Sequence, residues 1–180
     1  DHMHSGLAAI IIQDSAGSGK AINSNKQILK NNTLISSIKM PVDLFIPSAG
    51  VQTSIYVFEA GIPHDFDKTV RFIDFRNDGY KRTKRRLIEI DHPIERYQDI
   101  VKIFKGGIRA KLPSSHKEFW DLKSIVVDDF INDTGSDWNF EAHQVIDTVP
   151  TEQDFMKVVS DYLSWEVSQV LRGNMNNDLN

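Results

Sequence analysis

Hydrophobic residues in the first half of the chain fall into short runs separated by polar turns, a pattern typical of strands. Residues 7–12 form a continuous apolar run, which predicts a strand buried on both faces of a parallel sheet. Residues 34–40 form a second run that ends at Pro41, because proline has no backbone N–H to donate. Residues 53–59 alternate in polarity and can run antiparallel to their neighbour, and residues 69–75 predict a further strand.

Helical spacing of apolar residues occupies three other segments. Residues 20–31 carry apolar positions seven residues apart, and with the strands on either side they predict a right-handed βαβ crossover. Residues 94–104 predict a second helix, with Pro93 suited to its first turn. Residues 151–171 predict a long amphipathic helix, for which Thr151 is an N-cap candidate.

These elements predict an α/β fold and divide the chain into five parts. Residues 1–6 resemble a cloning remnant and carry no weight in the fold prediction. Residues 7–80 form the α/β part, and residues 81–150 form a basic, helical and irregular extension. Residues 151–173 form the amphipathic C-terminal helix, and residues 174–180 are expected to be a frayed polar tail.

Composition narrows the classes of protein and of site. Of the 180 residues 40% are hydrophobic and 26% are charged, which is ordinary for a soluble globular domain. The chain has no cysteine and its histidines show no metal-ligand spacing, so we expect no disulfide and no metal site. Without a signal peptide or a long apolar run, the expected location is the cytoplasm, with no membrane contact. A formal net charge of −4 argues against autonomous DNA binding, since phosphate neutralisation needs a basic surplus.

The loop between the second and third predicted strands, residues 42–50, contains two large apolar residues, Leu44 and Phe45. Turns favour Gly, Asn, Asp and Ser, so a large aromatic residue is unusual there. One interpretation is a loop anchored by a hydrophobic plug, with Phe45 in the core. The other interpretation is that Phe45 binds a ligand.

Two further segments suggest phosphate binding. Residues 16–20 are similar to a phosphate loop, but Asp14 and Ala21 occupy the positions where the full pattern needs glycine and a hydroxyl residue. A flexible joint between strand and helix also explains those glycines. Residues 81–86 hold five basic residues in six, a pattern that is more often a solvated face. The candidates for contact with DNA phosphates are Arg82, Lys84, Arg85 and Arg86.

Two segments together resemble a known family. Residues 44–53 have the sequence L-F-I-P-S-A-G-V-Q-T, and residues 8–20 have the sequence A-A-I-I-I-Q-D-S-A-G-S-G-K. They resemble the late part of the catalytic domain of adenine-N6 DNA methyltransferases, above all the modification subunit of type I restriction–modification systems. In that family one segment closes the target-base pocket. It consists of a strand, a hydrophobic residue, a Phe and a small loop that leads into the next strand. The likeness covers about residues 7–80.

The resemblance implies a fold and a set of roles. It implies that residues 7–80 are the last strands of a Rossmann-like methyltransferase sheet, a βαβ unit plus added strands, followed by a C-terminal helical extension. It implies that Phe45 stacks on the flipped adenine, which must leave the duplex to be methylated. It places Pro47, Gly50 and Thr53 in the pocket loop, where Gly50 permits a tight backbone and Thr53 suits the strand start.

The resemblance also bears on cofactor binding, catalysis and partners. The family's S-adenosylmethionine loop and its Asn-Pro-Pro-aromatic motif do not occur in this sequence. We therefore expect a fragment whose parent binds S-adenosylmethionine, and which does not catalyse by itself. Its expected partners are DNA through the full complex, a specificity subunit or the remaining methyltransferase half, and a second copy of the chain.

Two rival functions come from other classes. One is a non-enzymatic interaction module that docks on a partner subunit through the helix 151–171. The other is an independent α/β nucleotide-binding enzyme. The incomplete phosphate-loop pattern argues against this function.

Overall fold

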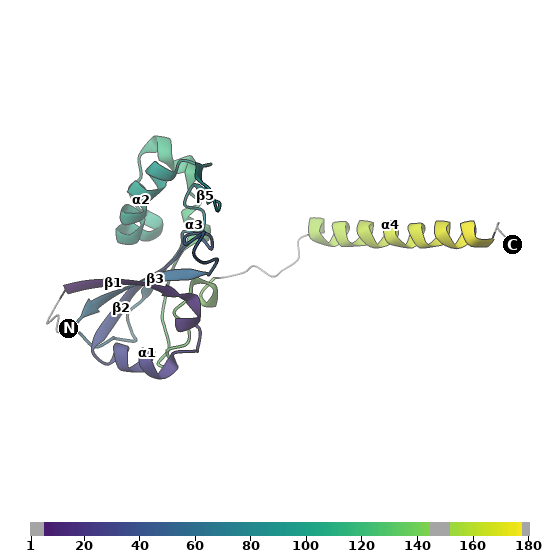
Figure 1. Ribbon diagram of the computed structural model, residues 1–180. Helices are drawn as coiled ribbons and strands as arrows, with labels where there is room; N and C mark the ends of the chain where they lie inside the picture. Colours follow the sequence, from purple (N-terminus) through teal and green to yellow (C-terminus); the bar gives the residue numbers. More distant parts are fainter. Residues whose placement is uncertain (1–5, 145–151, 178–180) are drawn as a thin grey trace. The chain divides into compact units, whose positions relative to one another are not determined.

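A five-stranded mixed sheet organises the first of the two units of the chain, Asp1–Gln144 (Figure 1). The computed structural model describes residues 6–144 and 152–177. The strands of the sheet are β1 (Gly6–Gln13), β2 (Asn32–Lys39), β3 (Thr53–Ala60), β4 (Val70–Asp74) and β7 (Val126–Asp129). Their order is β1-β3-β2-β4-β7, with β2 and β4 parallel and every other adjacent pair antiparallel.

The insertion of β3 between β1 and β2 corrects the simple crossover expected from the sequence. The helix α1 (Ile22–Leu29) connects β1 to β2, and both strands run in the same direction because both are antiparallel to β3. They do not pair with each other, since β3 takes the hydrogen bonds on the facing side of each. Periodicity along the chain predicts an element but carries no information about the order of pairing. The antiparallel direction predicted for residues 53–59 is confirmed.

A bulge in β2 lets that strand contribute to both faces of the sheet. Leu34 pairs with Phe58 and Ile38 pairs with Ile55, and the register shifts between Leu34 and Ser36. Side chains of a regular strand alternate between faces, so two residues four positions apart would share a face. The extra residue at the bulge reverses this order, and Leu34 and Ile38 enter different hydrophobic clusters.

Two hydrophobic clusters, one on each face, hold helices and loops against the sheet. The first packs beside α1 and contains Leu29, Leu34, Tyr56, Phe58, Val70, Phe72, Ile131, Trp138 and Phe140. The second packs against α2 (Pro93–Gly106) and α3 (Leu122–Ile125) and contains Ile38, Met40, Ile73, Phe75, Ile103, Leu112 and Val126. Figure 1 shows α1 on one side of the sheet and α2 with α3 on the other.

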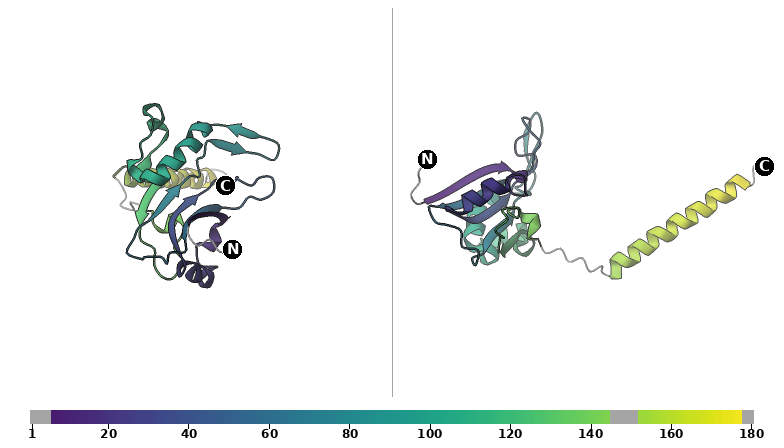
Figure 2. Two further views of the ribbon diagram at one scale, coloured as in Figure 1. Left: turned by 90° about the vertical axis from the view of Figure 1, so that its left-hand side faces the viewer. Right: turned by 90° about the horizontal axis from the view of Figure 1, so that it is seen from below.

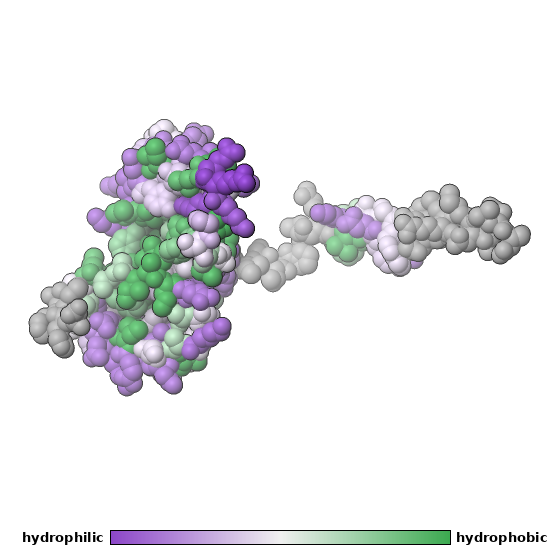
Figure 3. Space-filling view, in the orientation of Figure 1, coloured by the Kyte–Doolittle hydropathy of each residue, from purple (hydrophilic) through white to green (hydrophobic). Residues whose placement is uncertain are grey.

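The first strand lies at an edge of the sheet, which corrects its predicted burial. Four of its apolar side chains are 43 to 65% exposed, namely Leu7, Ile10, Ile11 and Ile12. Alternate residues point to opposite faces, so both faces of β1 are apolar and incompletely covered by the residues that the structure describes. The apolar run shows that both faces suit burial, but it does not say which residues cover them. Hydrophobic side chains gather on this part of the surface (Figure 3).

The segment predicted as an irregular extension contains several short elements. The basic run lies in a hairpin of β5 (Tyr80–Arg82) and β6 (Leu87–Glu89), and the second predicted helix is confirmed as α2, which begins at Pro93. The strand β7 comes from a stretch whose pattern was not regular enough to predict a strand. The 3-10 turns are η1 (Asp14–Ala16), η2 (Gly107–Arg109), η3 (Ser114–Phe119) and η4 (Phe140–Ala142).

The second unit, Val145–Asn180, contains one helix, α4 (Glu152–Asn177), among its described residues. The helix continues past Gly173, where the sequence predicts its end, because an interior glycine costs a helix only about 1 kcal/mol. Thr151, the predicted N-cap, and residues 178–180 of the predicted tail lie outside the described residues. None of the described helices is long and apolar enough to cross a membrane.

Candidate functional site

The loop between β2 and β3, residues 40–52, lies beside the β5–β6 hairpin at one end of the sheet. Figure 2 shows both segments extending from the same side of the molecule. The backbone N–H of Arg82 donates to Asp43 Oδ2 at 2.8 Å, and Arg82 Nη1 donates to Asp43 Oδ1 at 3.3 Å. The structure therefore brings together the two segments in which the sequence placed its candidate residues.

The two large apolar residues of this loop have different surroundings. Leu44 packs against the cluster that includes Met40 and Phe75, whereas Phe45 is 40% exposed. The carbonyl of Phe45 accepts hydrogen bonds from the backbone N–H groups of Ser48, at 2.8 Å, and Ala49, at 3.0 Å. Leu44 is therefore the hydrophobic plug of the loop, and Phe45 presents its ring at the surface on a hydrogen-bonded turn.

The other predicted loop residues occupy different environments. Pro47 and Gly50 are exposed, and a Cβ built on Gly50 would meet no atom within 4 Å. The backbone of Gly50 lies outside the left-handed region, so the described residues give no steric reason for a glycine there. Thr53 is buried as the first residue of β3, and its carbonyl accepts the N–H of Met40 at 3.0 Å, which closes the base of the loop.

The tip of the β5–β6 hairpin presents three basic side chains. Thr83 closes the turn, since its backbone N–H and its hydroxyl both donate to the carbonyl of Arg86, each at 3.0 Å. Lys84, Arg85 and Arg86 are exposed, and no carboxylate of residues 6–144 or 152–177 forms an ion pair with them. Their charges are therefore available to an anion from outside the chain.

The fourth predicted basic residue, Arg82, is half-buried in a network of its own. Its guanidinium pairs with Asp78, whose buried carboxylate also accepts the Tyr97 hydroxyl at 2.8 Å. Burial lowers the pKa of Arg82, but the hydrogen bond and the charge of Asp78 outweigh that effect and raise it. Burial and then the hydrogen bond to Asp78 raise the pKa of Tyr97 to about 12. Arg82 thus fixes the hairpin to the loop, and its predicted phosphate contact stays a prediction.

A second charged network holds the base of the same loop. The Lys39 ammonium, at the end of β2, is buried and lies 2.5 Å from Asp14 Oδ2 and in contact with Glu141. The Ser54 hydroxyl donates to Asp14 Oδ1 at 2.7 Å. These contacts join the end of β1, the end of β2 and the start of β3. Asp14, Asp43 and Asp78 were not predicted, because aspartates after strands and in turns are ordinary and carry no signal of their distant partners.

The segment that is similar to a phosphate loop is packed against the core. A Cβ on Gly17 would lie 2.3 Å from Tyr56 Oη and 2.4 Å from Asn139 Oδ1. Tyr56 donates its hydroxyl hydrogen to Asn139 Oδ1 at 2.6 Å, so these two groups are fixed by each other. Gly17 is required by this close approach rather than by flexibility, and the space next to it is already filled.

Comparison with known proteins identifies relatives of most of the chain. Residues 2–154 match the N-6 DNA Methylase family. Over 153 residues the chain is 30% identical to the type II restriction enzyme and methyltransferase RM.BcgI of Heyndrickxia coagulans. That alignment covers 82% of this chain and 21% of the relative, so the chain spans about a fifth of the length of the curated protein it matches.

Solved structures show a similar fold at low sequence identity. The methyltransferase subunit of the type I restriction–modification system from Streptococcus thermophilus matches with a TM-score of 0.53 and 16% identity, over 78% of this chain and 27% of that chain. The M protein of the type I restriction enzyme EcoKI matches with a TM-score of 0.53 and 15% identity, over 92% of this chain and 40% of that chain. These likenesses show a shared mixed α/β fold with a sheet at its core.

Proposed function

Because the chain belongs to the N-6 DNA methylase family, we propose that it forms the target-base side of the pocket in a site-specific adenine-N6 DNA methyltransferase of a restriction–modification system. The resemblance to modification subunits that the sequence indicated is confirmed. The observation that carries the proposal is the ring of Phe45, which is 40% exposed although its neighbour Leu44 is packed into the protein.

An exposed aromatic ring on a fixed loop is suited to stack on an extruded base. A methyltransferase must take its target base out of the duplex, and aromatic or apolar side chains then replace the lost stacking. Leu44 and the contacts of Asp43 with Arg82 hold the Phe45 turn in place before any DNA arrives. A preorganised surface loses less conformational entropy on binding. Pro47 and Gly50 share the exposed loop, and the open space at Gly50 suits a close approach of DNA to the backbone.

The hairpin beside the loop supplies the contact with phosphate. Lys84, Arg85 and Arg86 are exposed next to the loop that carries Phe45. Contacts with phosphates fix the position and register of a protein on the duplex, whereas contacts with bases provide specificity. The net charge of −4 makes DNA binding depend on this local patch and on the rest of the complex.

The family implies S-adenosylmethionine as the methyl donor, but the residues present here do not form its site. The loop after β1 is closed by Gly17, which packs against Tyr56 and Asn139 and leaves no cradle for a cofactor. The two family motifs for cofactor and methyl transfer do not occur in the sequence. We therefore assign cofactor binding and methyl transfer to the remainder of the full methyltransferase.

The open edge of β1 is the proposed junction with that remainder. In this proposal the strands β1, β3 and β2 are the last strands of a Rossmann-like sheet, and earlier strands pair along β1. Two observations support it: β3 is inserted antiparallel between two strands of equal direction, and the apolar side chains of β1 are exposed on both faces.

A single substitution tests the role of Phe45. In the complete methyltransferase that contains this chain, Phe45→Ala should remove about 1–3 kcal/mol of base stacking and lower methylation of unmodified DNA by about 5- to 150-fold. The matched control is Phe130→Ala, which truncates another exposed aromatic ring next to β7. The melting temperatures of both variants should stay close to that of the wild type.

Two outcomes would contradict this role. If Phe45 belongs to the core, its truncation costs about 3–5 kcal/mol of stability, and the melting drop accounts for the lost activity. If Phe130→Ala loses as much activity, exposed aromatic residues act in general and not at the target base. The chain alone, mixed with S-adenosylmethionine and unmethylated DNA, should leave adenines unmodified.

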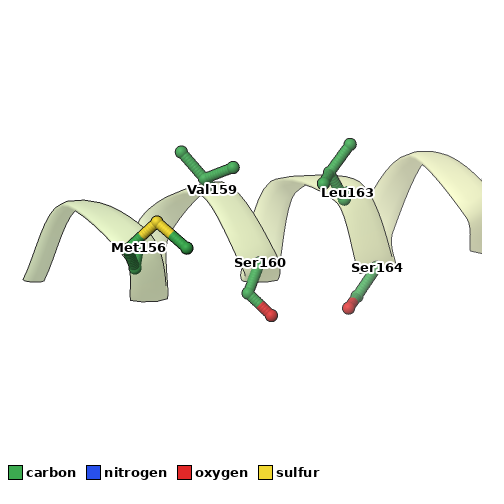
Figure 4. Close-up of a pocket in the computed structure, with 5 residues that line it drawn as sticks. All are labelled: Met156, Val159, Ser160, Leu163 and Ser164. Carbon is green, nitrogen blue, oxygen red and sulfur yellow. The ribbon is translucent and has the colours of Figure 1, made fainter. Parts of the chain in front are cut away.

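A second candidate function is favoured by α4. Phe155, Met156, Tyr162, Leu163 and Trp165 are large and exposed on this helix. Figure 4 shows Met156, Val159 and Leu163 along one side of α4, where they line a shallow apolar surface. We propose that this side docks on the specificity subunit. Leu163→Asp should abolish co-purification with that subunit, whereas Lys157→Asp, on the same helix, should retain it.

A further inference from the structure

Arg82 is the last residue of β5, and its contacts connect the tip of the hairpin to the Phe45 loop. On one side, its backbone N–H and its Nη1 donate to the two carboxylate oxygens of Asp43, at 2.8 Å and 3.3 Å. On the other side, its Nη2 donates to the carboxylate of Asp78. The guanidinium therefore lies between two carboxylates, one from the loop and one from the segment just before the hairpin.

The Asp78 side of this link is anchored in the core. Asp78 is 1% exposed, and its Oδ1 accepts the backbone N–H of Tyr80 at 3.0 Å, while its Oδ2 accepts the Tyr97 hydroxyl at 2.8 Å. The ring of Tyr97, on α2, meets the ring of Phe75 edge-on with centroids 5.1 Å apart. Phe75 belongs to the second hydrophobic cluster, so Tyr97 and Asp78 connect Arg82 to the packed interior.

The Asp43 side of the link is the start of the turn that carries Phe45. The carbonyl of Asp43 accepts the backbone N–H of Ile46 at 3.0 Å, and the carbonyl of Phe45 accepts two further hydrogen bonds within the same turn. Asp43 thus begins the turn with its backbone and binds Arg82 with its side chain. The position of the Phe45 turn relative to the hairpin is set by this pair.

The local charges distinguish Arg82 from the basic residues at the hairpin tip. Its side chain is 12% exposed and lies beside two carboxylates, so the three charges together are net negative. Lys84, Arg85 and Arg86 are exposed instead. A phosphate that approached Arg82 would be repelled by Asp43 and Asp78. This arginine is therefore better suited to joining two segments than to binding DNA.

We propose that Arg82 is a positioning residue, which holds the hairpin tip and the Phe45 ring at a fixed separation. The inference rests on the proposed function of the Phe45 loop and adds a coupling between its two contacts with DNA. The target base is joined to its phosphates by covalent bonds, so a protein that binds both must hold its own contact points at a matching separation. A misplacement of about 1 Å can lower a rate by about 100-fold. Asp78 and Tyr97 act through Arg82 by holding its guanidinium.

The first test measures the order of the loop in the ¹⁵N-labelled 180-residue chain by NMR relaxation. Backbone order parameters of residues 45–49 should be about 0.85 in the wild type and should fall below about 0.6 in Arg82→Ala, whereas those of β2 and β3 should not change. Tyr97→Phe removes only the hydroxyl that donates to Asp78 and should cause a smaller fall. Its matched control is Tyr80→Phe, because in the described part of the chain the Tyr80 hydroxyl has no hydrogen-bond partner.

The second test separates positioning from DNA affinity in the complete methyltransferase. Arg82→Ala should lower the single-turnover rate of methylation at saturating DNA by at least about tenfold and change the Kd for DNA by less than about threefold. The slope of log Kd against log salt concentration should stay the same, because no phosphate contact is lost. In contrast, Lys84→Gln with Arg85→Gln should weaken binding and reduce that slope by about 2. Arg82→Lys should recover little of the rate, because an ammonium lacks the fork that reaches both carboxylates.

Three results would overturn the proposal. The first is unchanged order parameters of residues 45–49 in Arg82→Ala or, if that variant does not fold, in Tyr97→Phe. The second is a reduced salt slope in Arg82→Ala, which would show that Arg82 binds a phosphate. The third is full recovery of the rate by Arg82→Lys, which would show that a positive charge alone is sufficient. Failure of the proposed function gives a different result: Phe45→Ala would keep its activity although Arg82→Ala loosens the loop, and the coupling would then have no role in methylation.

Discussion

The two edges of the sheet are built in opposite ways. β7 has four residues, and both of its carboxylates are paired: Arg71 binds Asp128 through two contacts of 2.7 Å, and His143 Nδ1 lies 2.8 Å from Asp129 Oδ2. β1 has eight residues, most of them apolar and exposed, and its outer side has no strand partner in the part of the chain that the structure describes. Natural sheets protect free edges with short strands and charged side chains, and β7 follows that rule while β1 does not.

The protection of the β7 edge extends to the segments around it. Arg71 Nη1 donates to the Phe104 carbonyl at 2.7 Å, and the His143 ring stacks on Phe72 with centroids 3.7 Å apart. Gly107 has a φ of +57°, and a Cβ there would lie 2.8 Å from the Arg71 guanidinium. Side-chain and backbone contacts thus close this edge together. The difference teaches that β7 is a protected end of the sheet, whereas β1 leaves an apolar edge open to pairing.

The largest expected effect is self-association of the isolated chain through β1. Unpaired N–H and C=O groups along an apolar strand are a template for pairing with a second copy, and the mass in sedimentation velocity should rise above 20.5 kDa with concentration. Ile10→Lys with Ile12→Lys should keep the chain monomeric. Val101→Lys, at an exposed position on α2, should not. A monomer at every concentration, with the amides of residues 7–12 protected from hydrogen exchange, would mean that the chain covers this edge by itself.

A smaller effect is expected from opening the β7 edge. Arg71→Ala removes the bidentate pair with Asp128 and leaves the Phe104 carbonyl without this donor, which should lower the free energy of unfolding by about 1–2 kcal/mol. The measurement is urea denaturation at neutral pH. Arg109→Ala removes an exposed arginine next to Gly107 and should stay within about 0.5 kcal/mol of the wild type. Equal losses in the two variants would show that this edge is not held by Arg71.

The smallest expected effect is on the stability of the fold at acidic pH. The hydrogen bond from His143 lowers the pKa of Asp129, against the opposing effect of burial. The folded pKa thus lies below the unfolded value of about 3.9, so the pair stabilises the fold above that pH and is lost as the pH falls through the folded pKa. Asp129→Asn should therefore flatten the acid limb of the stability curve, and Asp133→Asn should leave it unchanged. The idea fails if both variants keep the slope of the wild type in denaturation between about pH 3 and pH 6.

The elements with a long, regular pattern were predictable from the sequence. The predicted strand 69–75 is observed as Val70–Asp74, and the predicted helix 94–104 as Pro93–Gly106, because their periodicity and a proline mark them. The strands β5, β6 and β7 have three or four residues, too few to show a period. The burial of β1 was predicted wrongly. An apolar run indicates that a strand can be buried, but it does not show which residues cover it.

The exposed residues of the candidate site could be predicted from the sequence, whereas the residues that hold them in place could not. Phe45 and the basic run 81–86 stand out because a large aromatic is rare in a turn and five charges in six residues are rare anywhere. Asp43 lies 39 residues before Arg82 in the chain, and nothing local relates the two. Asp78 stands in an Asn-Asp-Gly sequence that indicates only a turn. Contacts between distant residues that fix an exposed group leave no periodic trace.

The bulge in β2 makes this strand sensitive to a change of length. Because the register shifts between Leu34 and Ser36, the two halves of the strand are out of phase by one residue. Deleting Ile35 would restore a regular alternation and turn the first half over, so that Leu34 would leave the cluster with Phe58 and face the side of Ile38. Leu34 and Ile38 therefore lie on opposite faces only while this one extra residue is present between them. A deletion of Ile35 would remove no buried residue of either hydrophobic cluster and would still place Leu34 in the wrong layer.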